Sequence, residues 1–267
     1  MQVLLGQLCP VPADVAANVG AITGALAEYA EAELAVFPEL FLGGYDLARV
    51  AELATDVAGP VIGELRAAAL GARTALVVGF AEALPDGGVA NAVACIDADG
   101  SLAAIYRKAY LFGAGERAAF VPGEALRIAE LAGRRAGPLV CFDMEFPEPA
   151  RALARAGADL LITVAANMDP FGPDHALVAR ARALENRRPH VYVNRCGGEA
   201  GLTFAGGSAV IGPDGSVQHQ LGREPRLACV ELADAPAMGS DADYLQHLRP
   251  DLAVEADQPI PTHGGTS

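Results

Sequence analysis

The stretch that decides the fold class of this chain is Gly137-Pro-Leu-Val-Cys-Phe-Asp-Met-Glu-Phe-Pro-Glu148. Its apolar part, residues 139–142, predicts a buried strand, and the proline at 147 predicts the start of a helix that runs to about residue 156. On both sides of this stretch, runs rich in valine, isoleucine and leucine alternate with alanine-rich helical segments. Because strands that alternate with helices are typical of α/β proteins, we predict an α/β fold.

The same alternation predicts further strands and helices, and two hairpins interrupt it. The turn sequences Asp99-Gly100 and Pro213-Asp214-Gly215 each lie between two short apolar runs and predict a hairpin. Hairpins mixed with β-α units indicate mixed sheets. The expected elements are strands at about 2–9, 34–38, 75–83, 160–165 and 190–194, hairpin strands at 92–97 with 102–106 and 208–211 with 216–218, and helices near 14–32, 60–72 and 174–186.

The length and composition predict a single domain. Hydrophobic residues make up 52% of the 267 residues, which suffices for a sizeable core. No internal repeat or linker divides the chain, so we expect one domain over residues 1–255. Residues 256–267 are rich in proline, glycine and threonine and are expected to form a C-terminal tail.

The net charge of the chain excludes some classes of binding partner. The formal net charge is −14 and no basic run is present, which argues against a nucleic-acid partner or an anionic membrane surface. No apolar run has the length of a membrane span, and the first residues do not resemble a signal peptide. We therefore expect a cytoplasmic protein that binds small molecules or copies of itself.

Cysteines and histidines are spaced in a way that indicates neither disulfides nor a metal site. The five cysteines form no Cys-x-x-Cys pair, and the five histidines show no His-x-x-x-His spacing. We predict no metal and no cofactor of this kind, and expect most of the cysteines to be small buried apolar residues.

Lys108 is the only lysine in the chain. Of the 19 lysine and arginine residues, the other eighteen are arginine. Lysine is a compact, movable cation with a tunable pKa, whereas arginine is a planar fork that stays charged. A site that needs one small cation would retain a lysine. The alternative is that this single lysine remains in the sequence by chance. The residues around Lys108 decide between a functional lysine and a chance one.

Three predicted strand ends carry side chains that together suit acyl transfer. Glu39 ends the apolar run 34–38, Lys108 follows the run 102–106, and Cys141 lies where a strand gives way to a helix. A base can take the thiol proton, the thiolate can attack a carbonyl carbon, and a cation with backbone amides can stabilise the oxyanion. Taken singly, a strand cysteine is more often a core residue, and a glutamate of this kind can be a surface residue.

A cysteine–histidine pair is the competing scheme for the same nucleophile. His175 and His190 are its candidates, but both lie in segments without catalytic spacing signals. The glutamate–lysine–cysteine set needs no histidine, and we prefer it.

These residues give the chain a resemblance to the carbon–nitrogen hydrolases of the nitrilase superfamily. The matching motifs are Phe-Pro-Glu-Leu around Glu39, Tyr-Arg-Lys at Lys108, Glu-Arg at Glu116 and Cys-Phe-Asp-x-x-Phe-Pro-Glu from Cys141. They occur in family order and at family-like separations. Further similarity runs through residues 181–187, 190–194, 207–208 and 248–252, so the resemblance covers residues 1–255.

The resemblance implies a four-layer α-β-β-α sandwich of two mixed sheets, and a homodimer or larger homo-oligomer. It implies that Glu39 is the general base, Lys108 the oxyanion-stabilising cation and Cys141 the nucleophile. It also implies that Glu116 positions substrate and lysine, and that the amide of Phe142 shares the oxyanion hole with Lys108. No cofactor is implied.

The residues after the nucleophile bear on the substrate. True nitrilases resemble Cys-Trp-Glu where this chain has Cys-Phe-Asp, which favours amide over nitrile hydrolysis. Relatives that act on carboxylate-bearing substrates often carry arginine four residues after the cysteine, where this chain has Glu145. Since a carboxylate repels acidic substrates and attracts amines, we predict a primary amide with a neutral or cationic acyl part, such as an amino-acid amide.

Further residues are expected in the pocket, and other interpretations of Glu145 and of the function are possible from the sequence. Glu145 can instead be structural and hold the lysine or a loop. Tyr45, Asn167 and Met168 follow strand ends and are expected to line the pocket, although Tyr45 can also be ordinary packing. The alternative functions are hydrolysis of an N-carbamoyl amine or amino acid, a nitrilase, a glutaminase module, and a catalytically inactive binding scaffold.

Overall fold

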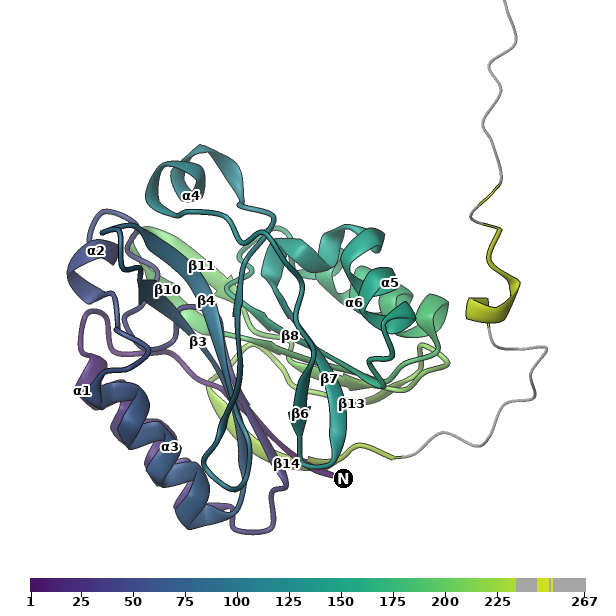
Figure 1. Cartoon of the computed structure of the whole chain (residues 1–267), viewed down its shortest axis with the longest axis horizontal. Helices are drawn as coiled ribbons and strands as arrows, with labels where there is room; N and C mark the ends of the chain where they lie inside the picture. Colours follow the sequence, from purple (N-terminus) through teal and green to yellow (C-terminus); the bar gives the residue numbers. More distant parts are fainter. Residues whose placement is uncertain (234–243, 250, 252–267) are drawn as a thin grey trace, which may run out of the picture.

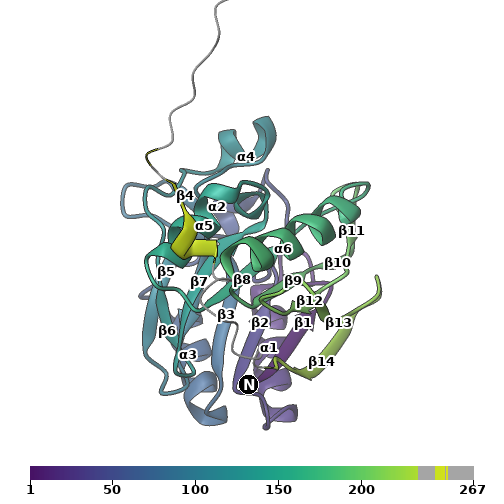
Figure 2. The same cartoon turned by 90° about the vertical axis from the view of Figure 1, so that its right-hand side faces the viewer.

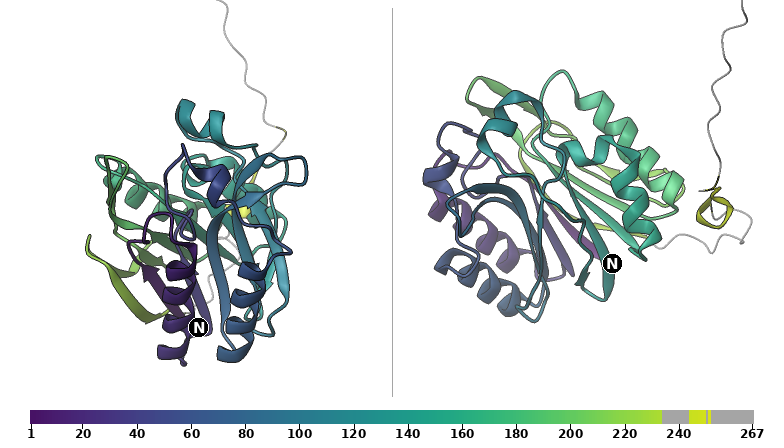
Figure 3. Two further views of the ribbon diagram at one scale, coloured as in Figure 1. Left: turned by 90° about the vertical axis from the view of Figure 1, so that its left-hand side faces the viewer. Right: turned by 45° about the horizontal axis from the view of Figure 1, so that its top comes forward.

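Two six-stranded sheets lie face to face between two layers of helices (Figure 1). The computed structural model describes residues 1–233, 244–249 and 251. Helices α1 (Val15–Glu28) and α3 (Pro60–Ala72) lie side by side on the outer face of the first sheet (Figure 3). Helices α5 (Pro147–Arg155) and α6 (Gly172–Asn186) cover the outer face of the second sheet (Figure 2). The predicted four-layer α-β-β-α sandwich is therefore confirmed.

The first sheet has parallel strands in its centre and antiparallel strands at its edges. Its order is β14-β1-β2-β3-β4-β5; β2 pairs parallel with β1 and β3, and the other pairs are antiparallel. The predicted hairpin around Asp99-Gly100 is the β4–β5 pair. The strands are β1 (Gln2–Gln7), β2 (Leu34–Phe37), β3 (Ala75–Ala83), β4 (Val89–Ile96), β5 (Leu102–Arg107) and β14 (Arg226–Glu231).

The second sheet repeats this arrangement. Its order is β13-β12-β9-β8-β7-β6, with β8 parallel to β7 and β9 and the other pairs antiparallel. The predicted second hairpin is the β12–β13 pair. The strands are β6 (Ala129–Leu131), β7 (Arg134–Val140), β8 (Leu160–Ala165), β9 (His190–Asn194), β12 (Ala209–Ile211) and β13 (Val217–Gln220).

Short elements surround the ends of these strands. They are α2 (Val50–Leu53), α4 (Gly113–Ala119), the hairpin of β10 (Cys196–Glu199) and β11 (Leu202–Ala205), and the 3₁₀ turns η1 (Cys141–Glu145) and η3 (Tyr244–His247). The expected C-terminal tail at 256–267 lies outside the described residues. No helix in the described part of the chain is long and apolar enough to cross a membrane.

The core explains why the central strands read as continuous apolar runs. Residues of β1, β2, β3, β7, β8 and β9 form one buried cluster between the two sheets, and two further clusters join each sheet to its helices. A strand covered on both faces has no solvent side, so the alternation of polar and apolar residues disappears. The sequence pattern and the sandwich therefore agree.

The sandwich brings several strand ends to one edge. Strands β2 and β3 are parallel, and β5 runs in the same direction because two antiparallel pairings separate it from β3. In the second sheet β7 and β8 also run parallel. The segments that follow β2, β5, β7 and β8 carry Glu39, Lys108, Cys141 and Ala166, and these residues meet at this edge.

The backbone next to Glu39 passes directly over β3. A Cβ atom placed on Gly79 of β3 would lie only 2.5 Å from Glu39 Cα. Glycine is required here because any side chain would push the segment after β2 away from the sheet.

Candidate active site

Lys108 lies between two glutamates in the interior of the protein. Its Nζ donates to Glu39 Oε1 at 2.7 Å and lies 2.9 and 2.8 Å from the two carboxylate oxygens of Glu116. The side chains of Lys108 and Glu39 are 0% exposed and that of Glu116 is 1% exposed. Burial by itself would lower the pKa of the Lys108 ammonium, but the charges of Glu39 and Glu116 outweigh it and raise the pKa. Lys108 therefore stays charged.

Glu39 is held on both carboxylate oxygens. Its Oε1 also accepts from Asn91 Nδ2 at 2.7 Å, and its Oε2 accepts from the backbone N–H of Ala166 at 2.7 Å. Asn91 belongs to β4, and Ala166 follows β8 of the other sheet. The carboxylate is thus fixed in one orientation by groups from both halves of the sandwich.

Glu116 is oriented by a second set of donors. Tyr45 Oη donates to its Oε1 at 2.6 Å, and the backbone N–H of Phe112 donates to its Oε2 at 2.8 Å. Burial, followed by the charges of Glu39 and Glu116, raises the pKa of Tyr45, so the phenol remains a donor. Tyr45 is therefore more than ordinary packing, because it contacts the glutamate that binds Lys108.

Cys141 occupies the first position of η1 with φ = +45°. The prediction that the strand continues to 142 is wrong, since β7 ends at Val140. A left-handed conformation in a non-glycine residue costs about 1–3 kcal/mol and occurs preferentially at functional sites. It turns the chain away from the sheet and leaves Cys141 partly exposed, in the wall of a pocket.

The thiol of Cys141 is kept protonated by its surroundings. Burial and the negative charges of Glu39 and Glu116 raise the pKa of the thiol well above its ordinary value, although Lys108 opposes them. A protonated thiol is a poor nucleophile, so Cys141 needs a base to remove its proton. The carboxylate of Glu39 is close enough to act on the charge state of Cys141.

The pocket beside Cys141 is small, and most of its exposed wall is apolar. Its volume is about 20 Å³, which is room for about one water molecule. The four residues predicted to bind substrate all lie in its wall, although their contact with substrate stays a prediction. The lining residues are Tyr45, Phe112, Glu116, Cys141, Phe142, Glu145, Ala166, Asn167, Met168, Phe171 and His175.

Glu145 contacts a histidine rather than the lysine. His175 Nε2 lies 3.1 Å from Glu145 Oε1, and His175 Nδ1 lies 3.1 Å from Tyr192 Oη. Both ring nitrogens of His175 thus have partners other than the thiol, which argues against a cysteine–histidine pair. His190 lies against Thr163 and the carbonyl of Ala179 in the interior, so it offers no base either.

Asn167 and Met168 follow β8 and are held by Asn194 at the end of β9. The Asn194 side chain accepts from the N–H of Asn167 at 2.8 Å and donates to its carbonyl at 3.0 Å. Asn167 Nδ2 is buried and makes no hydrogen bond of standard geometry, although the Asn167 side chain lies close enough to Tyr192 to act on its hydroxyl. Asn167 thus presents a donor in the pocket wall that is not firmly engaged.

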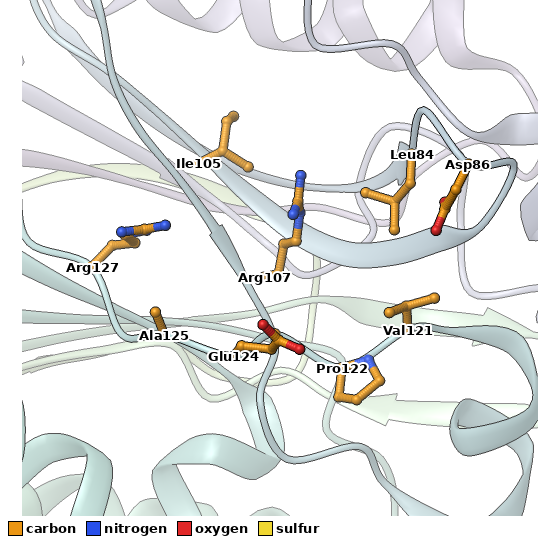
Figure 4. Close-up of a pocket in the computed structure, with 10 residues that line it drawn as sticks. Leu84, Asp86, Ile105, Arg107, Val121, Pro122, Glu124, Ala125 and Arg127 are labelled. Carbon is orange, nitrogen blue, oxygen red and sulfur yellow. The ribbon is translucent and has the colours of Figure 1, made fainter.

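A larger hollow of about 560 Å³ lies elsewhere, between β5 and the segment at 121–127 (Figure 4). The Arg107 side chain in its wall forms a bidentate ion pair with Glu82, with N–O distances of 2.6 and 2.7 Å. No cysteine, serine or histidine lines this hollow. Cys141 and Glu116 line the smaller pocket, so we place the candidate active site there.

The comparison with known proteins decides the class of this site. A family model described as carbon-nitrogen hydrolase matches residues 3–236. The chain belongs to the carbon–nitrogen hydrolase family. Over 260 residues this hydrolase is 38% identical to the (R)-stereoselective amidase of a Pseudomonas species, and the match covers 96% of this chain and 94% of the relative.

Solved structures place the hydrolase with amidases of the nitrilase superfamily. The amidase of Nesterenkonia sp. AN1 superposes with a TM-score of 0.84 at 35% identity, covering 94% of this chain and 97% of that chain. A cysteine-to-alanine variant of that amidase was solved with butyramide (TM-score 0.83, 34% identity, 94% and 95% coverage). The resemblance inferred from the motifs is confirmed, and this protein is an amidase-type carbon–nitrogen hydrolase.

Several residues that complete the hydrolase site were not anticipated from the sequence. Asn91 is a polar residue in the middle of an apolar run, which was an available signal. His175 was considered only as a base for Cys141 and not as a partner of Glu145, and Phe171 lies one helical turn before it at the start of α6, where the sequence carries no distinctive pattern. In the described part of the hydrolase, no group of histidine, cysteine and carboxylate side chains is placed to hold a metal ion.

Proposed function

We propose that this hydrolase cleaves a small primary carboxamide to the carboxylic acid and ammonia through a thioester on Cys141. The observation that carries the proposal is the buried Lys108 ammonium between the carboxylates of Glu39 and Glu116, next to a protonated thiol. This set supplies a base, a cation and a nucleophile in one water-poor place.

Glu39 acts as the base in the first half-reaction. It takes the proton of Cys141, and Sγ forms a bond to the amide carbon while the carbonyl oxygen becomes an oxyanion. Lys108 and the backbone amide of Phe142 stabilise the oxyanion. When the intermediate collapses, the C–N bond breaks and the proton held by Glu39 goes to the leaving nitrogen, which departs as ammonia.

The second half-reaction uses the same groups. Glu39 takes a proton from a water molecule, whose oxygen attacks the thioester carbon, and the C–S bond then breaks. The proton returns to Sγ and the acid leaves. Glu116 keeps Lys108 in place through both steps, since it is itself fixed by Tyr45 and Phe112.

The size of the pocket supports a small acyl group. A volume of about 20 Å³ leaves little room beyond the reacting carbonyl, and the half-exposed ring of Phe171 lies at its rim. The Nesterenkonia amidase was solved with butyramide and with acrylamide, which are small amides. Both observations favour short amides over long or branched ones.

Glu145 supports a neutral or cationic acyl part, such as that of an amino-acid amide. Only its Oε1 is engaged by His175, and its side chain is 35% exposed in the pocket wall. We expect Glu145→Arg to raise the ratio of kcat/KM for amides with acidic acyl groups to kcat/KM for amino-acid amides by about tenfold. The reason is that the side chain at position 145, which faces the acyl part of the substrate, changes from negative to positive. The measurement is ammonia release from paired acidic and cationic amides.

Glu148 is the matched control for this prediction. It lies three residues further along, in the first turn of α5, and is exposed. Glu148→Arg adds the same charge outside the pocket and is expected to leave the ratio of the two substrates unchanged. An unchanged ratio in Glu145→Arg would show that Glu145 only positions His175.

The test of the proposed reaction is ammonia release from a panel of primary amides, nitriles and N-carbamoyl amines, with carbon dioxide measured in the same samples. Amide hydrolysis releases the carboxylic acid and ammonia without carbon dioxide. Hydrolysis of an N-carbamoyl compound, the alternative, releases carbon dioxide as well. Ammonia from nitriles but not amides would identify a nitrilase, ammonia from glutamine alone would support a glutaminase module, and no release from any compound by the folded protein would favour a binding scaffold.

The proposal also includes the extent of the domain, the location of the protein and its oligomeric state. We infer one catalytic domain over residues 1–255, a cytoplasmic location and a homodimer or larger assembly, all of which rest on the sequence and on the family resemblance. Light scattering of the purified protein is expected to give at least twice the chain mass of 27.4 kDa. A strictly monomeric protein over a wide concentration range would contradict the assembly.

A further inference from the structure

Asp143 is a buried carboxylate, two residues after Cys141, that the proposed reaction does not use. It is 0% exposed and accepts four hydrogen bonds. Its Oδ1 accepts from the backbone N–H groups of Ala109 and Tyr110 at 3.1 and 2.9 Å. Its Oδ2 accepts from Tyr106 Oη at 2.8 Å and from the N–H of Val140 at 2.9 Å.

These four donors come from both halves of the sandwich. Tyr106 is in β5 of the first sheet, and Ala109 directly follows Lys108. Val140 is the last residue of β7 in the second sheet and directly precedes Cys141. Asp143 therefore connects the backbone beside the lysine with the backbone beside the nucleophile.

The hydrogen bonds to Met144 and Glu145 of the cysteine turn come from α6, and its Phe142 ring packs edge-on against Phe112, which follows β5. Arg182 donates from Nε to the carbonyl of Met144 and from Nη2 to that of Glu145, both at 2.9 Å, and His175 contacts the Glu145 side chain. Since α6 packs on the second sheet, these bonds fix the turn only to its own side. Glu39, Lys108 and Glu116 belong to segments of the first sheet. The Glu39–Ala166 bond ties one of them to the second sheet, but a link to the backbone beside Cys141 itself is needed to place the thiol against them.

Apolar packing between the two sheets does not supply such a link. Hydrophobic burial is non-directional, and small sliding movements change it little. Hydrogen bonds constrain distance and angle, and a buried carboxylate with all its bonds formed constrains them strongly. Burial raises the pKa of Asp143 to about 6, opposed by its N–H donors and by Lys108, so it is an anionic acceptor at neutral pH.

We propose that Asp143 is a positioning residue that holds Cys141 at the correct distance from Lys108 by joining the backbone on either side of them. The proposal rests on the thioester function proposed above. Asp143 contacts neither substrate nor the reacting atoms, and its effect is on the geometry in which the thiolate and the ammonium act on the same carbonyl group. It should therefore affect the chemical step more than substrate binding.

Asparagine at this position cannot make the same set of bonds. An amide has one oxygen, so the NH₂ group that replaces Oδ2 would face the N–H of Val140, donor against donor. The hydroxyl of Tyr106 can turn to accept, but the bond to the residue before Cys141 is lost. Asp143→Asn thus removes the link to the nucleophile while changing the volume very little.

Asp97 offers a matched control. Its Oδ1 accepts from the N–H of Ala132 at 2.8 Å, which also joins the first sheet to the second. Asp97 follows β4, and Ala132 lies between β6 and β7, so this link is at the opposite end of the strands from Cys141. Asp97→Asn weakens the same kind of contact away from the site.

The experiment measures kcat and KM of the full-length protein on its best amide. We expect Asp143→Asn to lower kcat by about 10- to 100-fold with KM changed less than about threefold, because a displacement of about 1 Å has that effect on a reaction between positioned groups. Asp97→Asn is expected to keep kcat within about twofold of native. A native-like kcat in Asp143→Asn, a change in KM alone, or an equal loss in Asp97→Asn would overturn the proposal.

A second variant and a second readout cover the case in which Asp143→Asn does not fold. Tyr106→Phe removes one of the four bonds, retains the carboxylate charge, and is expected to lower kcat by about three- to tenfold. The readout is the pH dependence of Cys141 alkylation by iodoacetamide. Burial and Glu39 raise the pKa of the thiol more than Lys108 lowers it, so a looser site should move the midpoint of this profile to lower pH in both variants.

The alkylation profile also separates this proposal from the proposed function. If the native protein hydrolyses no amide, the thioester function fails, while the profile still reports how Cys141 is placed relative to Glu39, Lys108 and Glu116. An unshifted midpoint in a folded Asp143→Asn or Tyr106→Phe protein would overturn the positioning role even if the native protein is an active amidase.

Discussion

Replacing Cys141 with alanine is expected to abolish amide hydrolysis. Without Sγ no thioester can form, and a buried base and cation alone do not attack an amide at a useful rate. Removal of a catalytic nucleophile typically lowers kcat by about 10⁵- to 10⁶-fold, so the variant should fall to the background of the assay. The measurement is ammonia release at saturating amide, with the intact mass of the native protein followed for an added acyl group.

Cys229 is the matched control for the nucleophile. Like Cys141 it is a partly exposed free cysteine, but it lies in β14, away from the pocket. Cys229→Ala is expected to keep native activity. Ammonia release by a folded Cys141→Ala protein, or an equal loss in Cys229→Ala, would contradict a thioester mechanism.

Replacing Lys108 with methionine should produce the second large effect, on both activity and stability. Methionine has a similar length but no charge, so the oxyanion loses its cation and kcat should fall by at least about 10²- to 10³-fold. The carboxylates of Glu39 and Glu116 would then face each other, buried and without a counter-charge. We expect the free energy of unfolding to fall by about 3–5 kcal/mol, measured by urea denaturation.

The stability loss in Lys108→Met should depend on pH in a defined direction. Protonation of one carboxylate removes the repulsion, so the difference from native should shrink as the pH is lowered and grow as it is raised. Arg49→Met is the control, because Arg49 pairs with Glu52 at the surface, where the two side chains are 49% and 66% exposed. It is expected to lower stability by about 1 kcal/mol or less and to leave kcat unchanged. A Lys108→Met protein with native stability or native kcat would contradict the assignment of the ammonium.

The charge balance at Cys141 has a consequence for the free enzyme. The thiol is protonated while the site is empty, because burial and two carboxylates oppose a thiolate. In the proposed reaction a bound carbonyl changes this balance, since the negative charge passes from sulfur to the oxyanion that Lys108 is proposed to stabilise. We therefore expect the thiol to be activated when substrate is bound, and an empty site to resist oxidation, which requires thiolate character.

Much of the site could be predicted from the sequence because its main groups lie at the ends of recognisable strands. Glu39, Lys108 and Cys141 each follow an apolar run, and the structure brings all three together. The boundary at Cys141 was misplaced by two residues because an apolar cysteine and phenylalanine continue the pattern of the strand. A left-handed residue leaves no mark in hydrophobic periodicity.

The groups that hold these residues could not be predicted in the same way. Asn91 bonds to Glu39 across 52 positions and Tyr45 bonds to Glu116 across 71. His175 contacts Glu145, whereas the sequence predicted that Glu145 meets the substrate or, as the alternative, holds the lysine or a loop. Each contact depends on strand order, register and the packing of two sheets, and no local pattern encodes these.

The sequence by itself determined the α/β class, the family and the residues that suit the chemistry, because periodicity, turn residues and short motifs are local properties of a chain. Only the tertiary structure decided which donors fix each carboxylate, that Cys141 is strained and its thiol protonated, and that Asp143 joins the two sheets beside Lys108 and Cys141. These features arise from burial and from distances between remote segments. Burial and these distances exist only once the chain has folded. An ionisable group has a shifted pKa, and a hydrogen bond has a fixed geometry, only in defined surroundings.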